Sequence, residues 1–134
     1  MKKNVLLFLL IITLFSCKKE ASEVVQTVTE NAATTEIQLI QFHTEHRCVT
    51  CNNIEKLSKE TIQGNDKISF VIYNLDDEKN VAISEQFQAT GTSLYLYNST
   101  TKNTKDLTEM AFMYAKNEGN KFKSELEKEI IAFK

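Results

Sequence analysis

The pair Cys48 and Cys51 is the feature that most constrains this chain. It follows a mostly apolar run, Glu36 to Phe42, and it opens a segment in which apolar residues recur at a helical spacing. This pattern predicts a buried strand, a short polar loop, and then a dithiol at the first turn of a helix. The two sulfurs are therefore expected where a thiol is most easily activated.

A helix start favours the ionised form of Cys48. The first turn leaves backbone N–H groups unpaired and carries the positive end of the helix dipole, so the pKa of a thiol there is expected to fall. Arg47 is expected to add a second positive charge. Cys51 lies one turn further along, within reach of the Cys48 sulfur, so the pair is able to close and reopen a disulfide.

Length and charge limit the classes of function. A chain of 134 residues is of single-domain length, and we expect one domain and a monomer. The formal net charge of -2, without a basic cluster, excludes a nucleic-acid surface. The chain has no Trp and no Pro, so neither a tryptophan beside the dithiol nor a cis-prolyl turn is expected.

The amino terminus has the pattern of an export signal. Met1 to Asn4 is basic, and Val5 to Phe15 is an apolar run too short to span a bilayer as a permanent helix. It ends in Leu14-Phe15-Ser16-Cys17, which resembles the lipobox of bacterial lipoproteins. That resemblance implies cleavage after Ser16 and a lipid on Cys17.

Three segments of the chain follow from this interpretation. Residues 1–16 are a lipoprotein signal peptide, residues 17–35 are the lipidated cysteine and a flexible tether, and residues 36–134 are the folded domain. The protein is then anchored to a membrane of the cell envelope and faces the periplasm or the exterior. Two alternatives remain: an ordinary signal peptide that leaves Cys17 lost or free, and a short amphipathic helix over Ala21 to Glu30 within the tether.

Hydrophobic periodicity predicts the order β-α-β-α-β-β-α for the domain, with a helix after the dithiol that ends near Gly64. The first two strands flank that helix and are expected to be parallel. The Met and aromatic residues at 110–114 are expected in the core rather than in a ligand patch. The remaining predicted elements are a strand at Lys67–Tyr73, a helix at Lys79–Gln88, a strand at Ser93–Asn98, an edge strand at Thr104–Thr108, and helical segments before and after Gly119, the second with an apolar stripe at Phe122, Leu126, Ile130 and Phe133.

This order, with the Cys-x-x-Cys at the first helix, resembles the thioredoxin fold in its minimal form. Two further stretches carry the resemblance: Tyr73 to Asn80 looks like the turn after the second core strand, and Phe87 to Leu94 looks like the run into the third. The resemblance implies an α/β domain whose central mixed sheet is flanked by helices.

The chain departs from the thioredoxin pattern at three places. Thr92 or Ser93 stands where thioredoxins have a cis-proline that faces the dithiol. The strand from Ile37 to Phe42 carries no acidic residue, whereas thioredoxins keep a buried carboxylate there. Arg47-Cys48-Val49-Thr50-Cys51 replaces their Trp-Cys-Gly-Pro-Cys. These changes leave the expected fold intact and bear on reaction rate and redox direction.

The first functional hypothesis is a thiol–disulfide oxidoreductase of the cell envelope. Cys48 would be the nucleophile and Cys51 the resolving thiol. Arg47, His46, Thr92 and Ser93 would be auxiliary residues of the site. No cofactor beyond the redox-active disulfide is expected, and the partner would be a cysteine-containing exported protein or a membrane electron donor.

Two alternatives compete with it. His43, His46, Cys48 and Cys51 are four suitable ligands within nine positions, which would suit the binding or delivery of copper or zinc. A purely structural Cys48–Cys51 disulfide is the third hypothesis, although the loop that it closes is too small for much stabilisation.

Overall fold

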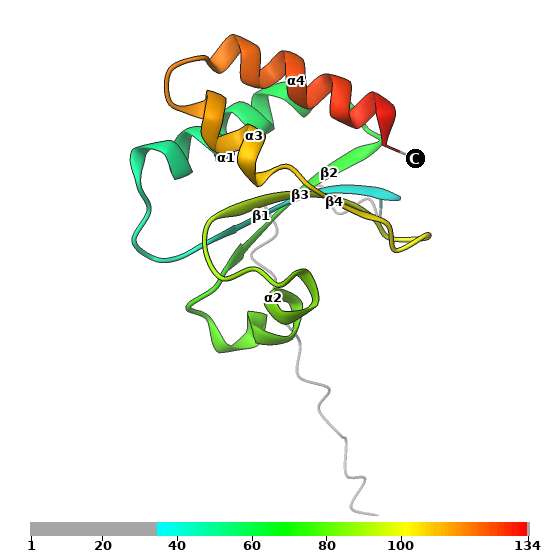
Figure 1. Ribbon diagram of the computed structural model, residues 1–134. Coiled ribbons are helices and arrows are strands. Elements are labelled where there is room, and N and C mark those ends of the chain that lie inside the picture. The colour runs from blue at the N-terminus through cyan, green and yellow to red at the C-terminus, as the bar shows by residue number, and fades with distance from the viewer. Residues whose placement is uncertain (1–34, 134) are drawn as a thin grey trace, which may run out of the picture.

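The computed structural model describes residues 35–133 (Figure 1). The predicted signal peptide (1–16), the lipidation site Cys17 and nearly all of the predicted tether lie outside the described residues. Within the described range, no helix is both long enough and apolar enough to cross a bilayer.

The secondary structure has the predicted order, with two helices at the carboxyl end. A four-stranded sheet has the strand order β2-β1-β3-β4. β1 pairs parallel with β2 and antiparallel with β3, and β3 pairs antiparallel with β4, so the sheet is mixed. The elements are β1 (Ile37–His43), α1 (Val49–Ile62), β2 (Ile68–Asn74), the 3-10 turn η1 (Glu78–Asn80), α2 (Val81–Phe87), β3 (Ser93–Asn98), β4 (Thr104–Asp106), α3 (Thr108–Ala115) and α4 (Gly119–Ala132). The predicted α/β class is confirmed, and the architecture is consistent with a minimal thioredoxin fold.

Helices cover both faces of the sheet. In Figure 1, α1, α3 and α4 lie together on one face, and α2 lies on the other. Because side chains alternate across a strand, central β1 supplies both layers. Leu39 belongs to the cluster under α1, α3 and α4, whereas Ile40 and Phe42 belong to the cluster on the α2 side.

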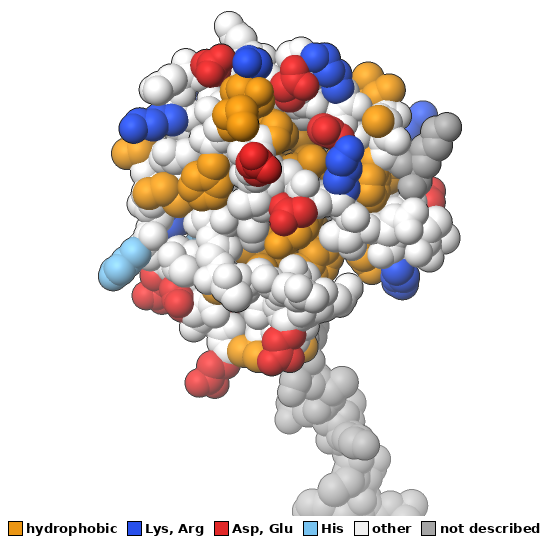
Figure 2. Space-filling view, viewed as in Figure 1, with side chains coloured by type: hydrophobic (Ala, Val, Ile, Leu, Met, Phe, Trp, Pro, Cys, Tyr) orange, Lys and Arg blue, Asp and Glu red, His pale blue; other side chains and the backbone are white. Residues whose placement is uncertain are grey.

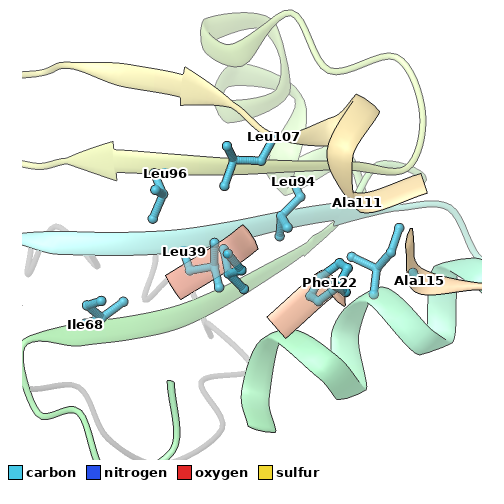
Figure 3. Packing of buried hydrophobic residues seen from close by; sticks show 10 residues of the cluster. Leu39, Ile68, Leu94, Leu96, Leu107, Ala111, Ala115 and Phe122 are labelled. Carbon is cyan, nitrogen blue, oxygen red and sulfur yellow. The ribbon is translucent and has the colours of Figure 1, made fainter. Parts of the chain in front are cut away.

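The larger core is mostly aliphatic and is closed by the carboxyl-terminal helix (Figure 3). Phe122 and Leu126 of α4 are fully buried in it, and Ile130 and Phe133 pack at its border, so the predicted stripe is confirmed. Gly119 is the first residue of α4 rather than a break before it. A Cβ at this position would come within 3.2 Å of the Leu57 side chain, so glycine lets α4 approach α1 closely.

The smaller core is aromatic. The Phe42 ring lies 5.5 Å from that of Phe87 and 5.9 Å from that of Tyr95, centroid to centroid. Phe87 and Tyr95 are 5.3 Å apart, which closes a three-ring cluster between β1, α2 and β3. Tilted and edge-to-face arrangements of this kind stabilise a core beyond the area that they bury.

The structure corrects two details of the prediction and confirms a third. The helix predicted at Lys79–Gln88 is a 3-10 turn followed by α2, and Val81, the first residue of α2, is exposed. α1 ends at Ile62, and Gly64 follows with a φ of +80°, so the glycine does adopt the left-handed conformation. Phe112 and Met113, expected in the core, are exposed on α3.

Candidate active site

The loop between β1 and α1 places the dithiol beyond the carboxyl end of the central strand β1. β1 ends at His43, whose carbonyl accepts the Leu75 N–H at 2.7 Å. The Glu45 N–H donates to the Asp76 carboxylate at 2.6 Å. These bonds tie the loop to the turn after β2, so the chain enters α1 from a fixed direction.

Cys48 is the N-cap residue of α1. Its backbone is extended, with φ -76° and ψ 163°, and its carbonyl accepts the Asn52 N–H at 3.1 Å. Its Sγ accepts the Cys51 N–H, also at 3.1 Å, and so stands where a serine or aspartate oxygen usually caps a helix. No acidic residue occupies the first turn of α1, so no carboxylate there competes for the N–H groups. Cys48 is exposed.

Cys51 lies behind Cys48 and is only 5% exposed. The two residues form a disulfide, with their Cα atoms 5.1 Å apart. The pair is therefore asymmetric, because an incoming thiolate reaches the Cys48 sulfur from solvent while Cys51 faces the protein.

Arg47 pairs with Glu55 and does not offer its charge to Cys48 as the sequence suggested. Its Nη1 lies 2.5 Å from the Glu55 carboxylate, which also holds the Lys59 ammonium at 2.5 Å. Partial burial alone would raise the pKa of Glu55, but hydrogen bonds from Lys59 and Arg47 and their charges hold it below the ordinary value. The carboxylate offsets the positive charge that Arg47 was expected to offer to Cys48.

The structure distinguishes the two residues predicted opposite the dithiol. The Thr92 hydroxyl donates to the Cys51 sulfur at 3.4 Å. The Ser93 hydroxyl instead donates to the Gly91 carbonyl at 3.2 Å. Thr92 therefore faces the site, Ser93 supports the loop, and every peptide bond within residues 35–133 is trans.

Sequence reasoning missed Gln41. This side chain is 0% exposed, and its Nε2 donates to the Cys51 carbonyl at 3.1 Å. Its Oε1 is buried with no hydrogen-bond partner among the described residues. The available signal was an amide between Ile40 and Phe42, within a strand predicted to be buried on both faces.

The two histidines do not join the cysteines in a metal site. His46 is exposed, and the His43 Nδ1 lies 2.8 Å from the Thr44 carbonyl oxygen. Across residues 35–133, no three His, Cys, Asp or Glu side chains gather closely enough to hold an ion. The geometry gives the metal hypothesis no support.

Apolar side chains are exposed at the start of α1, next to Cys48, and on α3. Val49 is 74% exposed, and Phe112 and Met113 are exposed on α3. The Asn53 amide donates to the Ala115 carbonyl at 3.1 Å, which fixes the end of α3 over the start of α1. Figure 2 shows hydrophobic side chains on this part of the surface with acidic and basic side chains among them, and further acidic side chains over α2 and its connections.

No protein-family model matches the chain, and no curated protein matches it. Among solved structures, one described as "Structure of a malarial protein" is similar to it, with a TM-score of 0.42 and 16% sequence identity. The similarity covers 59% of this chain and 94% of the other. A likeness of this size carries no argument about function.

Proposed function

We propose that the protein is a thiol–disulfide oxidoreductase of the thioredoxin-like type, with Cys48 as the nucleophile and Cys51 as the resolving thiol. One observation carries the proposal: the exposed Cys48 sulfur accepts an N–H group at the start of α1, while its disulfide partner is buried. A thiolate in that position gains a charge-assisted hydrogen bond and the favourable end of the helix dipole.

The reaction consists of two exchanges. A partner thiolate attacks the Cys48 sulfur, the Cys48–Cys51 bond breaks, and Cys51 leaves with the electron pair. A second partner thiolate then attacks the partner's sulfur in the mixed disulfide and releases Cys48 as a thiolate. The partner dithiol is oxidised to a disulfide, and the protein takes up its two electrons. The reverse sequence, in which Cys51 attacks the mixed disulfide at Cys48, reduces a partner disulfide.

The proposal also includes the cellular location of the protein and its redox partner. The sequence Leu14-Phe15-Ser16-Cys17 supports a lipid-anchored protein of the cell envelope, facing the periplasm or the exterior. Its partner would be an exported protein with cysteines or an electron donor in the membrane. The disulfide itself is the redox group, so the reaction requires no further cofactor.

A trapping experiment tests the proposal. In Cys51→Ser, the mixed disulfide at Cys48 has no resolving thiol and should accumulate, whereas Cys48→Ser should trap nothing. Exposure of the reduced variants to oxidised glutathione or to a disulfide-linked peptide, followed by mass analysis of peptides, counts adducts at each cysteine separately. Changing both His43 and His46 to Ala should alter the rate without abolishing exchange.

Two results would contradict the proposal. Equal trapping by the two cysteine variants would remove the assigned roles. Tight Cu(I) or Zn(II) binding that is lost on either histidine change, together with no trapped partner, would favour the metal hypothesis instead.

A further inference from the structure

Neutral groups hold Cys51 on two sides. The Thr92 hydroxyl donates to its sulfur at 3.4 Å, and the Gln41 amide donates to its carbonyl at 3.1 Å. Thr92 lies in the loop before β3 and Gln41 lies in β1, so two different parts of the fold contact the first turn of α1. The buried sulfur is therefore fixed relative to the sheet.

The redox step places charge on this sulfur. When a thiolate attacks Cys48, the S–S bond breaks and Cys51 leaves as a thiolate with the bonding electron pair. Cys51 is 5% exposed, so little water reaches the new charge. A hydrogen-bond donor already directed at the sulfur stabilises an anion there more than it would in bulk water.

We propose that Thr92 is a further catalytic residue, whose hydroxyl stabilises the charge that develops on Cys51 as the disulfide opens. The inference rests on the proposed redox function. It adds that the Thr92 hydroxyl makes Cys51 a better leaving group. The Thr92 bond to a neutral disulfide sulfur becomes charge-assisted, and hence stronger, when the sulfur carries the electron pair. In the reverse direction, the same bond holds the Cys51 thiolate where it attacks the mixed disulfide at Cys48.

The neighbouring serine provides a matched control. Ser93, the first residue of β3, is buried directly after Thr92, and its hydroxyl donates to the Gly91 carbonyl rather than to a sulfur. Ser93→Ala therefore removes a buried hydroxyl next to the site without removing the contact to Cys51. Thr92→Val removes that contact and keeps the shape of the side chain, and Thr92→Ser restores a hydroxyl.

The experiment measures how fast excess dithiothreitol reduces the full-length oxidised protein. Acid quenching, alkylation and peptide mass analysis follow the Cys48–Cys51 peptide and count Cys17 separately. Thr92→Val should lower the rate constant about tenfold, which corresponds to ~1.4 kcal/mol in the barrier. Thr92→Ser and Ser93→Ala should stay within about threefold of the wild type. The glutathione equilibrium of Thr92→Val should also shift several-fold toward the disulfide, because a reduced sulfur is the better acceptor.

The outcomes separate this inference from the proposed function. If Thr92→Val reacts within about twofold of the wild type, or if Thr92→Ser is as slow as Thr92→Val, the hydroxyl has no catalytic role and the inference is overturned. Thr92→Ala supplies a second variant without a hydroxyl, with the same expected loss, should Thr92→Val fail to fold. The proposed function has its own readout, the mixed disulfide trapped by Cys51→Ser, which does not depend on Thr92.

Discussion

A charge placed at Val49 should shift the reactivity of Cys48 in a direction set by its sign. Val49 is the first residue of α1, follows the N-cap cysteine directly and is 74% exposed, so it accepts a charged side chain without disturbing the core. Val49→Asp should raise the pKa of the Cys48 thiol, and Val49→Lys should lower it. Val49→Asn is the neutral control.

The magnitude follows from Coulomb's law. A charge on a neighbouring side chain lies on the order of 7 Å from the sulfur, and at the dielectric constant of water this gives roughly 0.6 kcal/mol. One pKa unit is 1.36 kcal/mol, so each variant should shift the pKa by about half a unit. The two charged variants should then differ by about one unit at low ionic strength. In about 1 M salt, where the Debye length falls to ~3 Å, most of the difference should disappear.

The assay is the rate of iodoacetamide alkylation of the reduced protein as a function of pH, with adducts assigned to Cys48 by peptide mass. The midpoint of the rate profile gives the thiol pKa. Shifts of the same sign for Asp and Lys would refute the electrostatic reasoning. A midpoint near 8.5, the ordinary value for a free cysteine, in the wild type and in every variant would show that the helix start does not activate the thiol.

Three further predictions test other parts of the structure. Glu55→Gln should free the charge of Arg47 and lower the pKa of the exposed thiol, measured by the same alkylation profile. Because the pKa of Glu55 is lowered by folding, its stabilising contribution is complete above its ordinary value of 4.5 and is lost as the pH falls below it, so urea unfolding of the Gln variant should depend less on pH in that window. Phe122→Ala, in the larger core, should lower the free energy of unfolding by about 3–5 kcal/mol, whereas Ile131→Ala, 81% exposed on the same helix, should change it by less than about 0.5 kcal/mol. Cys17→Ala should abolish incorporation of labelled fatty acid and membrane partitioning, and equal labelling of both proteins would end the lipoprotein hypothesis.

Hydrophobic periodicity predicted the features of the fold that follow from the sequence pattern within a single helix or strand. The stripe that begins at Phe122 follows from helical spacing alone, and the central place of β1 follows from its mostly apolar run. For the run at 110–114 the same reasoning was only partly right, because Met110 and Tyr114 pack against the core whereas Phe112 and Met113 are exposed. Five consecutive apolar side chains on a helix cannot all face one core, so Phe112 and Met113 lie on the surface while Ala111 is buried.

The site was only partly predictable, because its contacts join residues that are distant in the sequence. The cysteines were found from their spacing, and their position at a helix start followed from the pattern around them. The pairing of Arg47 with Glu55 depends on how the loop folds back along α1. The choice between Thr92 and Ser93 depends on which hydroxyl the loop turns toward Cys51, and no local pattern in the sequence reports that direction.

The alternation of side chains along β1 limits which changes in chain length the protein tolerates. One residue inserted within the strand would exchange its two faces, placing Ile40 and Phe42 under the large helices and Leu39 among the aromatic rings. Gln41 would lose its position at the Cys51 carbonyl in the same step. The turn between β3 and β4 carries no such constraint, since it is largely exposed and contributes to neither core. Related chains should therefore differ in length at that turn and keep β1 at a constant length ahead of the dithiol.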